Sequence, residues 1–302
     1  MDPTLRMVLG SVVPVFGLIG LSFLFSRRFH PDLAAVLRLT AQIFIPCLVF
    51  SSVLQAEVAA ADVRNALLAT VIQIGSGLIL GGLTLRLLAA RFPSWRDKRE
   101  VLLPIAFVNS ANLPFPIVLS VFGAEGISYA VICFLVTNFT VFTVGNAWLQ
   151  GGRKWRQALK EPALWATVLA FSLRLLGVNV PPELFGIPKL AGQAAVPLML
   201  VLFGDALART RMAVPSIALV GVVMRYATGT IALWLTLTLL RPEGTLRSVL
   251  ILYALLPSAV VNVVLTQRAG RDAAAVASVV LATTLVALAL VPWLLTRLVG
   301  AQ

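Results

Sequence analysis

The stretch that decides the fold is residues 101–126, VLLPIAFVNSANLPFPIVLSVFGAEG, an apolar run interrupted by two asparagines and two closely spaced prolines. Pro114 and Pro116 each lack a backbone N–H donor, and they disfavour helical geometry for Leu113 and Phe115. A helix entering at the start of this run should therefore stop about 17 Å into a hydrocarbon core about 30 Å thick. Pro116 suits the first turn of a second half-helix, whose N–H groups would point at the centre of the membrane. Irregular backbone at that depth must be covered by protein or line a watery cavity.

The rest of the chain has the composition of a membrane protein. Of its 302 residues, 59% are apolar and only 12% are charged, about half the charged fraction of a soluble domain. A span takes roughly 20 apolar residues, so the length suits about ten spans in a single membrane domain, residues 1–302. The 24 Lys and Arg exceed the 12 Asp and Glu. No arginine-rich stripe or interleaved aromatic run accompanies this excess, which indicates basic loops and no nucleic-acid binding.

Ten spans can be placed between the charged residues. Six contain no ionisable residue: 7–26, 65–85, 101–124, 126–152, 248–267 and 273–296. Four more contain or adjoin one charge: 33–54 with Arg38, 163–180 with Arg174, 189–208 with Asp205, and 214–240 with Arg225. Arg38, Arg174 and Lys189 lie near span ends, where we expect their long stems to carry the charge to the interface.

The distribution of Lys and Arg predicts the orientation. The connectors on one side hold 15 of these residues and those on the other side hold six. The positive-inside rule makes the side with 15 cytoplasmic, so both termini are expected outside a plasma (inner) membrane that the chain crosses many times.

The chain also repeats itself at about half its length. Three pairs of short motifs recur in the same order: Arg38-Leu39-x2-Gln42-x2-Ile45-Pro46 with Lys189-Leu190-x2-Gln193-x2-Val196-Pro197, Pro104-x4-Asn109 with Pro257-x4-Asn262, and Gly123-x-Glu125 with Gly270-x-Asp272. They fall on corresponding spans of two five-span halves, about 1–150 and 151–302. Because five is odd, the second half is inverted. The predicted fold is all-α and integral to the membrane, with ten helices in two inverted repeats and broken, crossing helices four and nine, an arrangement typical of transporters.

The polar residues beside the two breaks are the candidate site. Half-helix N-termini attract a carboxylate, and neutral amides beside them can donate to it. The candidate substrate-binding residues are Asn109, Asn112, Pro114, Pro116, Pro257, Ser258, Asn262, Asn138, Gln42 and Gln193. Thr137, Ser278 and Thr283 could line the same site or serve as interhelical hydrogen-bonding residues.

Two charged residues inside spans are candidates for coupling. Asp205 either takes part in coupling or caps a cytoplasmic helix end beside Arg209, and Arg225 either faces an anion at the midplane or reaches the cytoplasmic interface. Glu125 and Asp272 are expected to stabilise the N-termini of spans five and ten.

The runs at 109–126, NSANLPFPIVLSVFGAEG, and at 255–278, LLPSAVVNVVLTQRAGRDAAAVAS, resemble the auxin efflux carrier family of secondary transporters. The resemblance covers nearly the whole chain. It implies the fold of the related bile acid:sodium symporters and sodium/proton antiporters, in which spans 1, 2, 6 and 7 form a scaffold and spans 3 to 5 and 8 to 10 move as an elevator. It also implies transport of organic anions such as auxin, malate and malonate. Pro114 and Pro116 depart from the glycine-containing LGLP-like run that is common in the family.

Several other function classes are excluded. The chain has no GxxxxGK[ST] loop for ATP, and its single histidine, His30, cannot build a zinc HExxH site or a Ser/His protease. Cys47 and Cys133 lie in apolar stretches and suit core positions. We therefore expect no enzyme, no cofactor and no bound metal other than a coupling ion.

The sequence predicts a carrier of small organic anions whose coupling to H⁺, to Na⁺ or to neither stays open. Its expected partners are the anion and membrane lipid, and a homodimer is compatible with the prediction. The alternatives are a sodium-coupled symporter of the bile-acid type and, more remotely, a membrane enzyme that acts on lipid.

Overall fold

The computed structural model describes residues 3–55, 59–150 and 161–299, and the regular secondary structure in these ranges is helical. Seven segments are long and apolar enough to cross a membrane: Val12–Phe29, Ala34–Gln55, Ala60–Arg91, Pro114–Gln150, Pro182–Arg209, Pro215–Leu239 and Ala273–Leu298. Two shorter helices, Pro162–Leu175 and Gly244–Ala254, are also apolar. The prediction of an all-helical, multi-pass membrane protein is confirmed at this level.

The helices follow one another with short connections. In chain order they are α1 (Pro3–Phe29), α2 (Ala34–Leu39), the π-helix η1 (Thr40–Phe44), α3 (Ile45–Gln55), α4 (Ala60–Arg91), the 3-10 turns η2 (Pro93–Trp95) and η3 (Arg99–Val101), α5 (Leu102–Ala106), α6 (Pro114–Thr140), the π-helix η4 (Val141–Gly145), α7 (Asn146–Gln150), α9 (Pro162–Leu175), α10 (Pro182–Arg209), α11 (Pro215–Leu239), α12 (Gly244–Ala254), α13 (Val261–Arg268) and α14 (Ala273–Val299).

Helix α6 consists of two parts that meet at a sharp turn. Gly123 has φ 62° and ψ −151°, a backbone conformation that glycine adopts without the steric penalty of a Cβ atom. The part before Gly123 leads back to the proline-rich run, and the part after it continues through η4 and α7. The turn lies at the boundary that the sequence predicts between the spans 101–124 and 126–152.

Both breaks expected from the prolines are present. The first separates α5, which ends at Ala106, from α6, which begins at Pro114; the second separates α12, which ends at Ala254, from α13, which begins at Val261. One detail of the prediction is wrong, because Leu113 has helical dihedrals and Phe115 lies inside α6. Pro114 and Pro116 occupy the first turn of α6, where the N–H groups they lack have no partner within the helix. The irregular backbone therefore starts earlier than expected, at Phe107.

Several expected spans differ in length from the structure. Helix α9 has 14 residues, about 21 Å of helix, and ends five residues before the predicted end of the span 163–180. Helix α4 has 32 residues, about 48 Å, and extends beyond the predicted span 65–85 at both ends. Helix α10 begins at Pro182, seven residues before Lys189, and continues through Pro188 and Pro197.

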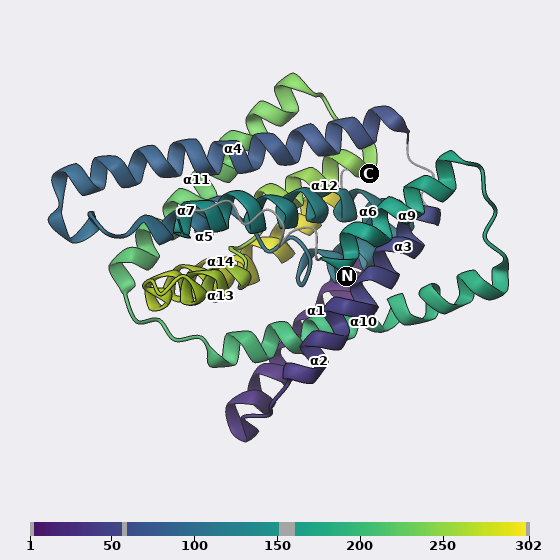
Figure 1. Ribbon diagram of the computed structural model, residues 1–302, viewed down its shortest axis with the longest axis horizontal. Helices are drawn as coiled ribbons and strands as arrows, with labels where there is room; N and C mark the ends of the chain where they lie inside the picture. Colours follow the sequence, from purple (N-terminus) through teal and green to yellow (C-terminus); the bar gives the residue numbers. More distant parts are fainter. Residues whose placement is uncertain (1–2, 56–58, 151–160, 300–302) are drawn as a thin grey trace.

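The helices pack in two groups. In one group, α10 packs against α1 and α3, and α3 also packs against α9. In the other, α4 and α14 pack against α11, while α12 packs against α6. Figure 1 shows α4 as a long helix along one side of the molecule and α1, α2 and α10 gathered on the other. Fewer contacts join the groups, and they run chiefly between α1 or α3 and α6 or α14.

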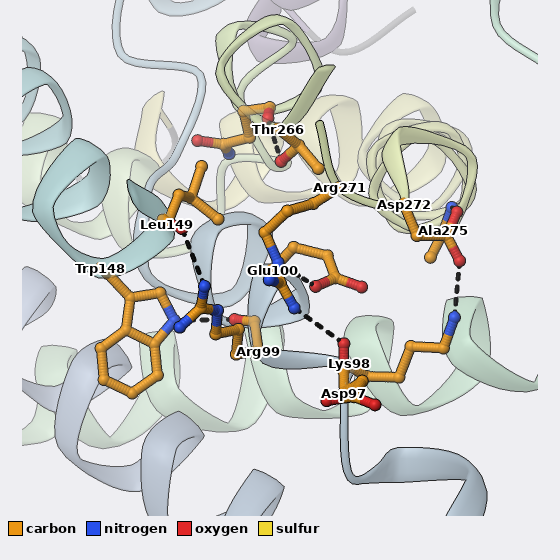
Figure 2. A network of polar contacts seen from close by, with 11 residues as sticks. Asp97, Lys98, Arg99, Glu100, Trp148, Leu149, Thr266, Arg271, Asp272 and Ala275 are labelled. Atoms are coloured by element: carbon orange, nitrogen blue, oxygen red, sulfur yellow. Dashed lines mark hydrogen bonds and ion pairs between the residues drawn. The ribbon is translucent and has the colours of Figure 1, made fainter. Parts of the chain in front are cut away.

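Connectors that the sequence assigns to the cytoplasmic side meet in a polar network (Figure 2). Lys98 Nζ lies 2.6 Å from Asp272 Oδ2, and Arg271 Nε lies 2.9 Å from Glu100 Oε2, whose residue is buried. Asp272 also accepts the N–H of Ala275 at 3.0 Å, so it caps α14 as predicted. Lys98 and Glu100, which precede the first break, are thus paired with Asp272 and Arg271, which follow the second break.

Candidate functional site

The two breaks cross and pair through their main chains. Val108 and Ser258 form an isolated antiparallel β-bridge. The N–H of Asn109 donates to the carbonyl of Pro257 at 2.8 Å, and the N–H of Ala259 donates to the carbonyl of Phe107 at 3.1 Å. Each break therefore satisfies part of the other's backbone, which is what irregular backbone inside a membrane protein requires.

Tyr253 satisfies a carbonyl that the prolines of the first break leave free. Because residue 114 is proline, the carbonyl of Ser110 has no helical N–H four residues later. The hydroxyl of Tyr253 lies 2.8 Å from this carbonyl oxygen and 3.0 Å from that of Ala130. The side chain of Tyr253 is buried, so the last turn of α12 is fastened to the first break.

Asn109 presents an unused donor at the crossing. Its Oδ1 accepts the N–H of Asn112 at 3.1 Å, so the side chain is held across the turn. Its residue is only 4% exposed, and its Nδ2 has no hydrogen-bond partner among the described residues. Leaving a buried donor unpaired costs about 1 to 3 kcal/mol, so this amide is suited to an acceptor that arrives from outside the chain.

Asn262 has a different role from Asn109. Its Nδ2 donates to the carbonyl of Phe107 at 3.0 Å, which ties α13 to the first break. The atom of Asn262 that has no partner within the described ranges is the acceptor Oδ1. Asn262 therefore offers an acceptor at this point, where the sequence suggests a donor.

The helix N-termini at the breaks carry few free N–H groups. Pro114 and Pro116 have none, and the N–H of Phe115 donates to the carbonyl of Ala111 at 3.0 Å. At the start of α13, the N–H of Asn262 donates to the carbonyl of Ala259 at 3.2 Å. The expectation that the first residues of both half-helices point free N–H groups at the membrane centre is wrong for these positions, because prolines and tight turns remove them.

The matched motifs Pro104-x4-Asn109 and Pro257-x4-Asn262 do not occupy equivalent places. Pro104 lies inside α5, whereas Pro257 lies in the second break. The bridge pairs residues 108 and 258, and the same spacing of 150 aligns Asn112, not Asn109, with Asn262. Ser258 is fully buried, donates its hydroxyl to the carbonyl of Pro104, and donates its N–H to Thr283 Oγ1 at 3.1 Å.

The end of α12 is held by Arg225 and Gln73. The Arg225 side chain donates from Nε to the carbonyl of Leu256 at 3.2 Å and from an Nη2 group to that of Ala254 at 2.9 Å. Gln73 Nε2 donates to the carbonyl of Tyr253 at 2.9 Å. Arg225 is 1% exposed, so the interfacial alternative for this residue is wrong: its guanidinium lies in the protein interior.

The remaining candidates take part in none of the hydrogen bonds described for the crossing. Gln42 and Gln193 are exposed, and Asn138 lines a small hollow with Glu161. Asp205 accepts from Arg209 Nε at 2.8 Å, and its other oxygen is buried without a partner among the residues described. The structure therefore brings together Asn109, Asn112, Pro114, Pro116, Pro257, Ser258 and Asn262 at the crossing, but not Gln42, Gln193, Asn138 or Asp205.

Two residues of the crossing are not identified by the sequence argument. Tyr253 and Gln73 are polar groups within apolar runs, which is a usable signal, because a buried hydroxyl or amide needs a partner. Their spacing gives no hint of which carbonyl they reach. Within the described residues, no cluster of three His, Cys, Asp or Glu side chains could hold a metal ion.

The comparisons with known proteins identify a family of membrane transport proteins. The model of the membrane transport protein family matches residues 7–154 and 147–295, which together span nearly the whole chain. An "Uncharacterized transporter" of Methanothermobacter thermautotrophicus is 27% identical over 298 residues, with 94% of this chain and 92% of that protein covered. The chain thus belongs to the membrane transport protein family, which is the auxin efflux carrier family that its crossover runs resemble.

Proposed function

We propose that this protein is a secondary transporter that moves small organic anions, carboxylates of the auxin-like, malate or malonate class, across the plasma membrane. The observation that carries the proposal is the unpaired, buried amide donor of Asn109 at the crossing of two broken helices. In a chain of a membrane transport family, such a donor at the crossing of two broken helices can bind an acceptor group of the substrate.

The charge around the crossing favours an anion. The N-terminus of α6 follows Asn109 by five residues, and the peptide dipoles of this long helix point their positive ends toward it, although the two prolines remove N–H groups there. The guanidinium of Arg225 adds a full positive charge at the end of α12. Since Asn109 itself is neutral, the group proposed to touch the substrate can release it without breaking a buried ion pair.

The proposed architecture is two inverted five-helix repeats. The bridge between residues 108 and 258 is consistent with a pseudo-two-fold axis through the crossing, and the breaks follow corresponding helices of the two halves. We place the connector that holds Arg96 on the cytoplasmic side and both termini outside, in agreement with the excess of Lys and Arg on that side.

We propose elevator-type alternating access for the movement. The group of α4, α5, α6, α11, α12, α13 and α14 would carry the crossing past the group of α1, α3, α9 and α10. The sparse packing between the groups supports this division, and so does the polar network, which joins residues 97–100 to residues 271–275 inside the moving group (Figure 2).

Uptake into proteoliposomes tests the proposal. Radiolabelled malate, malonate and indole-3-acetate would be offered separately with a proton gradient, with a sodium gradient and with neither. We expect saturable uptake of at least one anion, strongly reduced in Asn109→Ala and unchanged in Gln193→Ala, which alters an exposed amide. Uptake by Asn109→Ala at the wild-type rate would remove the crossing as the substrate site.

A further inference from the structure

At the second break, the end of α12 leaves main-chain carbonyl oxygens without helical partners, and Arg225 donates hydrogen bonds to two carbonyls there. Helix α12 ends at Ala254, and its last carbonyls carry roughly half a negative charge directed into the interior of the protein. Arg225 donates to the carbonyls of Ala254 and Leu256 at 2.9 and 3.2 Å. Carbonyls of unwound backbone and half-helix C-termini are the ligands with which transporters coordinate alkali cations.

The guanidinium has no acidic partner in the part of the chain that the structure describes. The three ion pairs found there join Lys98 to Asp272, Arg209 to Asp205, and Arg271 to Glu100. A buried charge needs compensation, and for Arg225 the described compensation is the pair of main-chain carbonyls. The guanidinium of Arg225 therefore occupies the carbonyl site at which an alkali cation would bind.

The surrounding backbone is shaped for this side chain. Gly229 follows Arg225 by one helical turn on α11, and a Cβ atom there would lie 2.2 Å from the Ala254 oxygen and 2.8 Å from an Nη1 atom of Arg225. Both distances are shorter than Cβ contacts in proteins. Glycine at this position thus leaves the space in which α11 approaches the end of α12 and the guanidinium lies between them.

We propose that Arg225 is a built-in cation, which fills the carbonyl site at the end of α12 in place of an exchangeable alkali ion. The second break then binds no sodium, and a fixed positive charge stays with it throughout the transport cycle. The consequence for coupling rests on the proposed carrier function, whereas the occupancy of the carbonyl site does not.

Thermal unfolding of the purified protein in lipid nanodiscs tests the occupancy without any organic anion. Unfolding would be followed in sodium, potassium or choline chloride at equal ionic strength, with and without guanidinium chloride at low millimolar concentration. We expect the wild type to respond equally to all these salts. We expect the unfolding midpoint of Arg225→Ala to be lower, and to be raised saturably by guanidinium by roughly 2 to 4 °C, because the free ion refills the site.

Two further variants make the result decisive. Arg174→Ala removes an exposed arginine near the end of α9 and should show no response to guanidinium. Arg225→Gln keeps one donor for a carbonyl but no charge, so it decides the matter if the alanine variant does not fold. A response of Arg225→Gln to guanidinium or sodium supports the proposal.

Either of two results would overturn the inference: a wild-type protein that sodium stabilises saturably, or folded variants of Arg225 that ignore both guanidinium and alkali ions. If neither variant folds, the wild-type salt series decides between the outcomes. If guanidinium restores Arg225→Ala while none of the tested anions is transported, the proposed function fails and the built-in cation stands.

Discussion

The two breaks have the same topology but are stabilised by different chemistry. At the first break, the carbonyls of Pro104, Phe107 and Ser110 accept from neutral donors: a serine hydroxyl, a main-chain N–H, an asparagine amide and a tyrosine hydroxyl. At the second break, the carbonyls of Ala254 and Leu256 accept from a guanidinium. The two breaks thus satisfy their unwound backbone in different ways.

Under the proposed function, this difference in hydrogen bonding assigns the two breaks different tasks. The first break contains two prolines and the unused amide donor of Asn109, so its shape is fixed by covalent geometry and its donor is free. The second break contains one proline, and its carbonyls at Ala254 and Leu256 accept hydrogen bonds from a charged group. We infer that the first break is specialised for contact with the substrate and the second for electrostatic balance.

The prolines give the largest expected effect. Replacing both Pro114 and Pro116 with Ala supplies N–H donors for the carbonyls of Ser110 and Asn112 and lets helix form across the first break. We expect transport to fall by roughly a hundredfold, because the amide of Asn109 is displaced, while membrane insertion survives. Uptake in proteoliposomes measures this, and Pro257→Ala should lose less, since Arg225 still holds the second break. Equal losses in the two variants would end the distinction between the breaks.

The asparagines come next. We expect Asn109→Ala to weaken binding of the transported anion by about 1.5 to 3 kcal/mol, or roughly 10- to 150-fold, because it removes the free donor. Asn262→Ala should instead lower the unfolding temperature, since its amide bonds the carbonyl of Phe107. Ligand titration and thermal unfolding of both variants separate the two roles. A variant of Asn262 that is fully stable but does not bind would reverse the assignment.

Removing the hydroxyl of Tyr253 tests how much one hydrogen bond at the first break contributes to stability. Tyr253→Phe leaves the buried carbonyl of Ser110 without its donor, and we expect a loss of about 1 to 2 kcal/mol. Unfolding in denaturant measures the loss. Tyr226→Phe is a matched control on α11, because its hydroxyl bonds the carbonyl of Thr283, away from the first break. Tyr226→Phe should lower the free energy of unfolding without changing transport, whereas Tyr253→Phe should reduce both.

The smallest effect belongs to the ion pair that links the approaches to the two breaks. Lys98 and Asp272 are partly exposed, at 26% and 34%, so Lys98→Met should cost only about 0 to 1 kcal/mol. Lys98 lowers the pKa of Asp272, so the pair stabilises the fold above the ordinary aspartate pKa of about 3.9 and loses this as pH falls through the lowered value. Unfolding between pH 3 and 7 should therefore depend less on pH in the variant. An unchanged profile would show that the pair contributes nothing.

The sequence predicts the breaks well and their partners poorly. Pro114 and Pro116 predict that a break precedes α6, because the absence of an N–H is a local property of the residue, but they do not predict that α5 already ends at Ala106. The bond from Tyr253 to Ser110 joins residues 143 positions apart, and no local pattern specifies it. The position of Arg225 is also undetermined locally, since it depends on where α12 ends.

The predicted internal repeat illustrates another limit of the sequence argument. The match between Gln42 and Gln193 is real in the sequence, but both side chains are exposed, away from the crossing. Recurrence shows that two positions correspond and does not show which face of a helix they occupy. The antiparallel bridge joins Val108 and Ser258, which are 150 positions apart, whereas the matched motif that contains Pro104 and Asn109 recurs at a spacing of 153.

The bridge between Val108 and Ser258 also constrains how the protein is made. Its two residues are 150 positions apart, and a ribosome adds that many residues in about 8 to 30 s at its usual rate. Throughout that interval the first break is already in the membrane, while the carbonyls of Phe107 and Ser110 lack their final donors. The nascent chain must then be kept near water or the insertion machinery until its last third arrives. Truncation before Tyr253 should consequently leave a chain whose first break lacks these donors and that membrane quality control recognises, even though its long helices are apolar enough to insert.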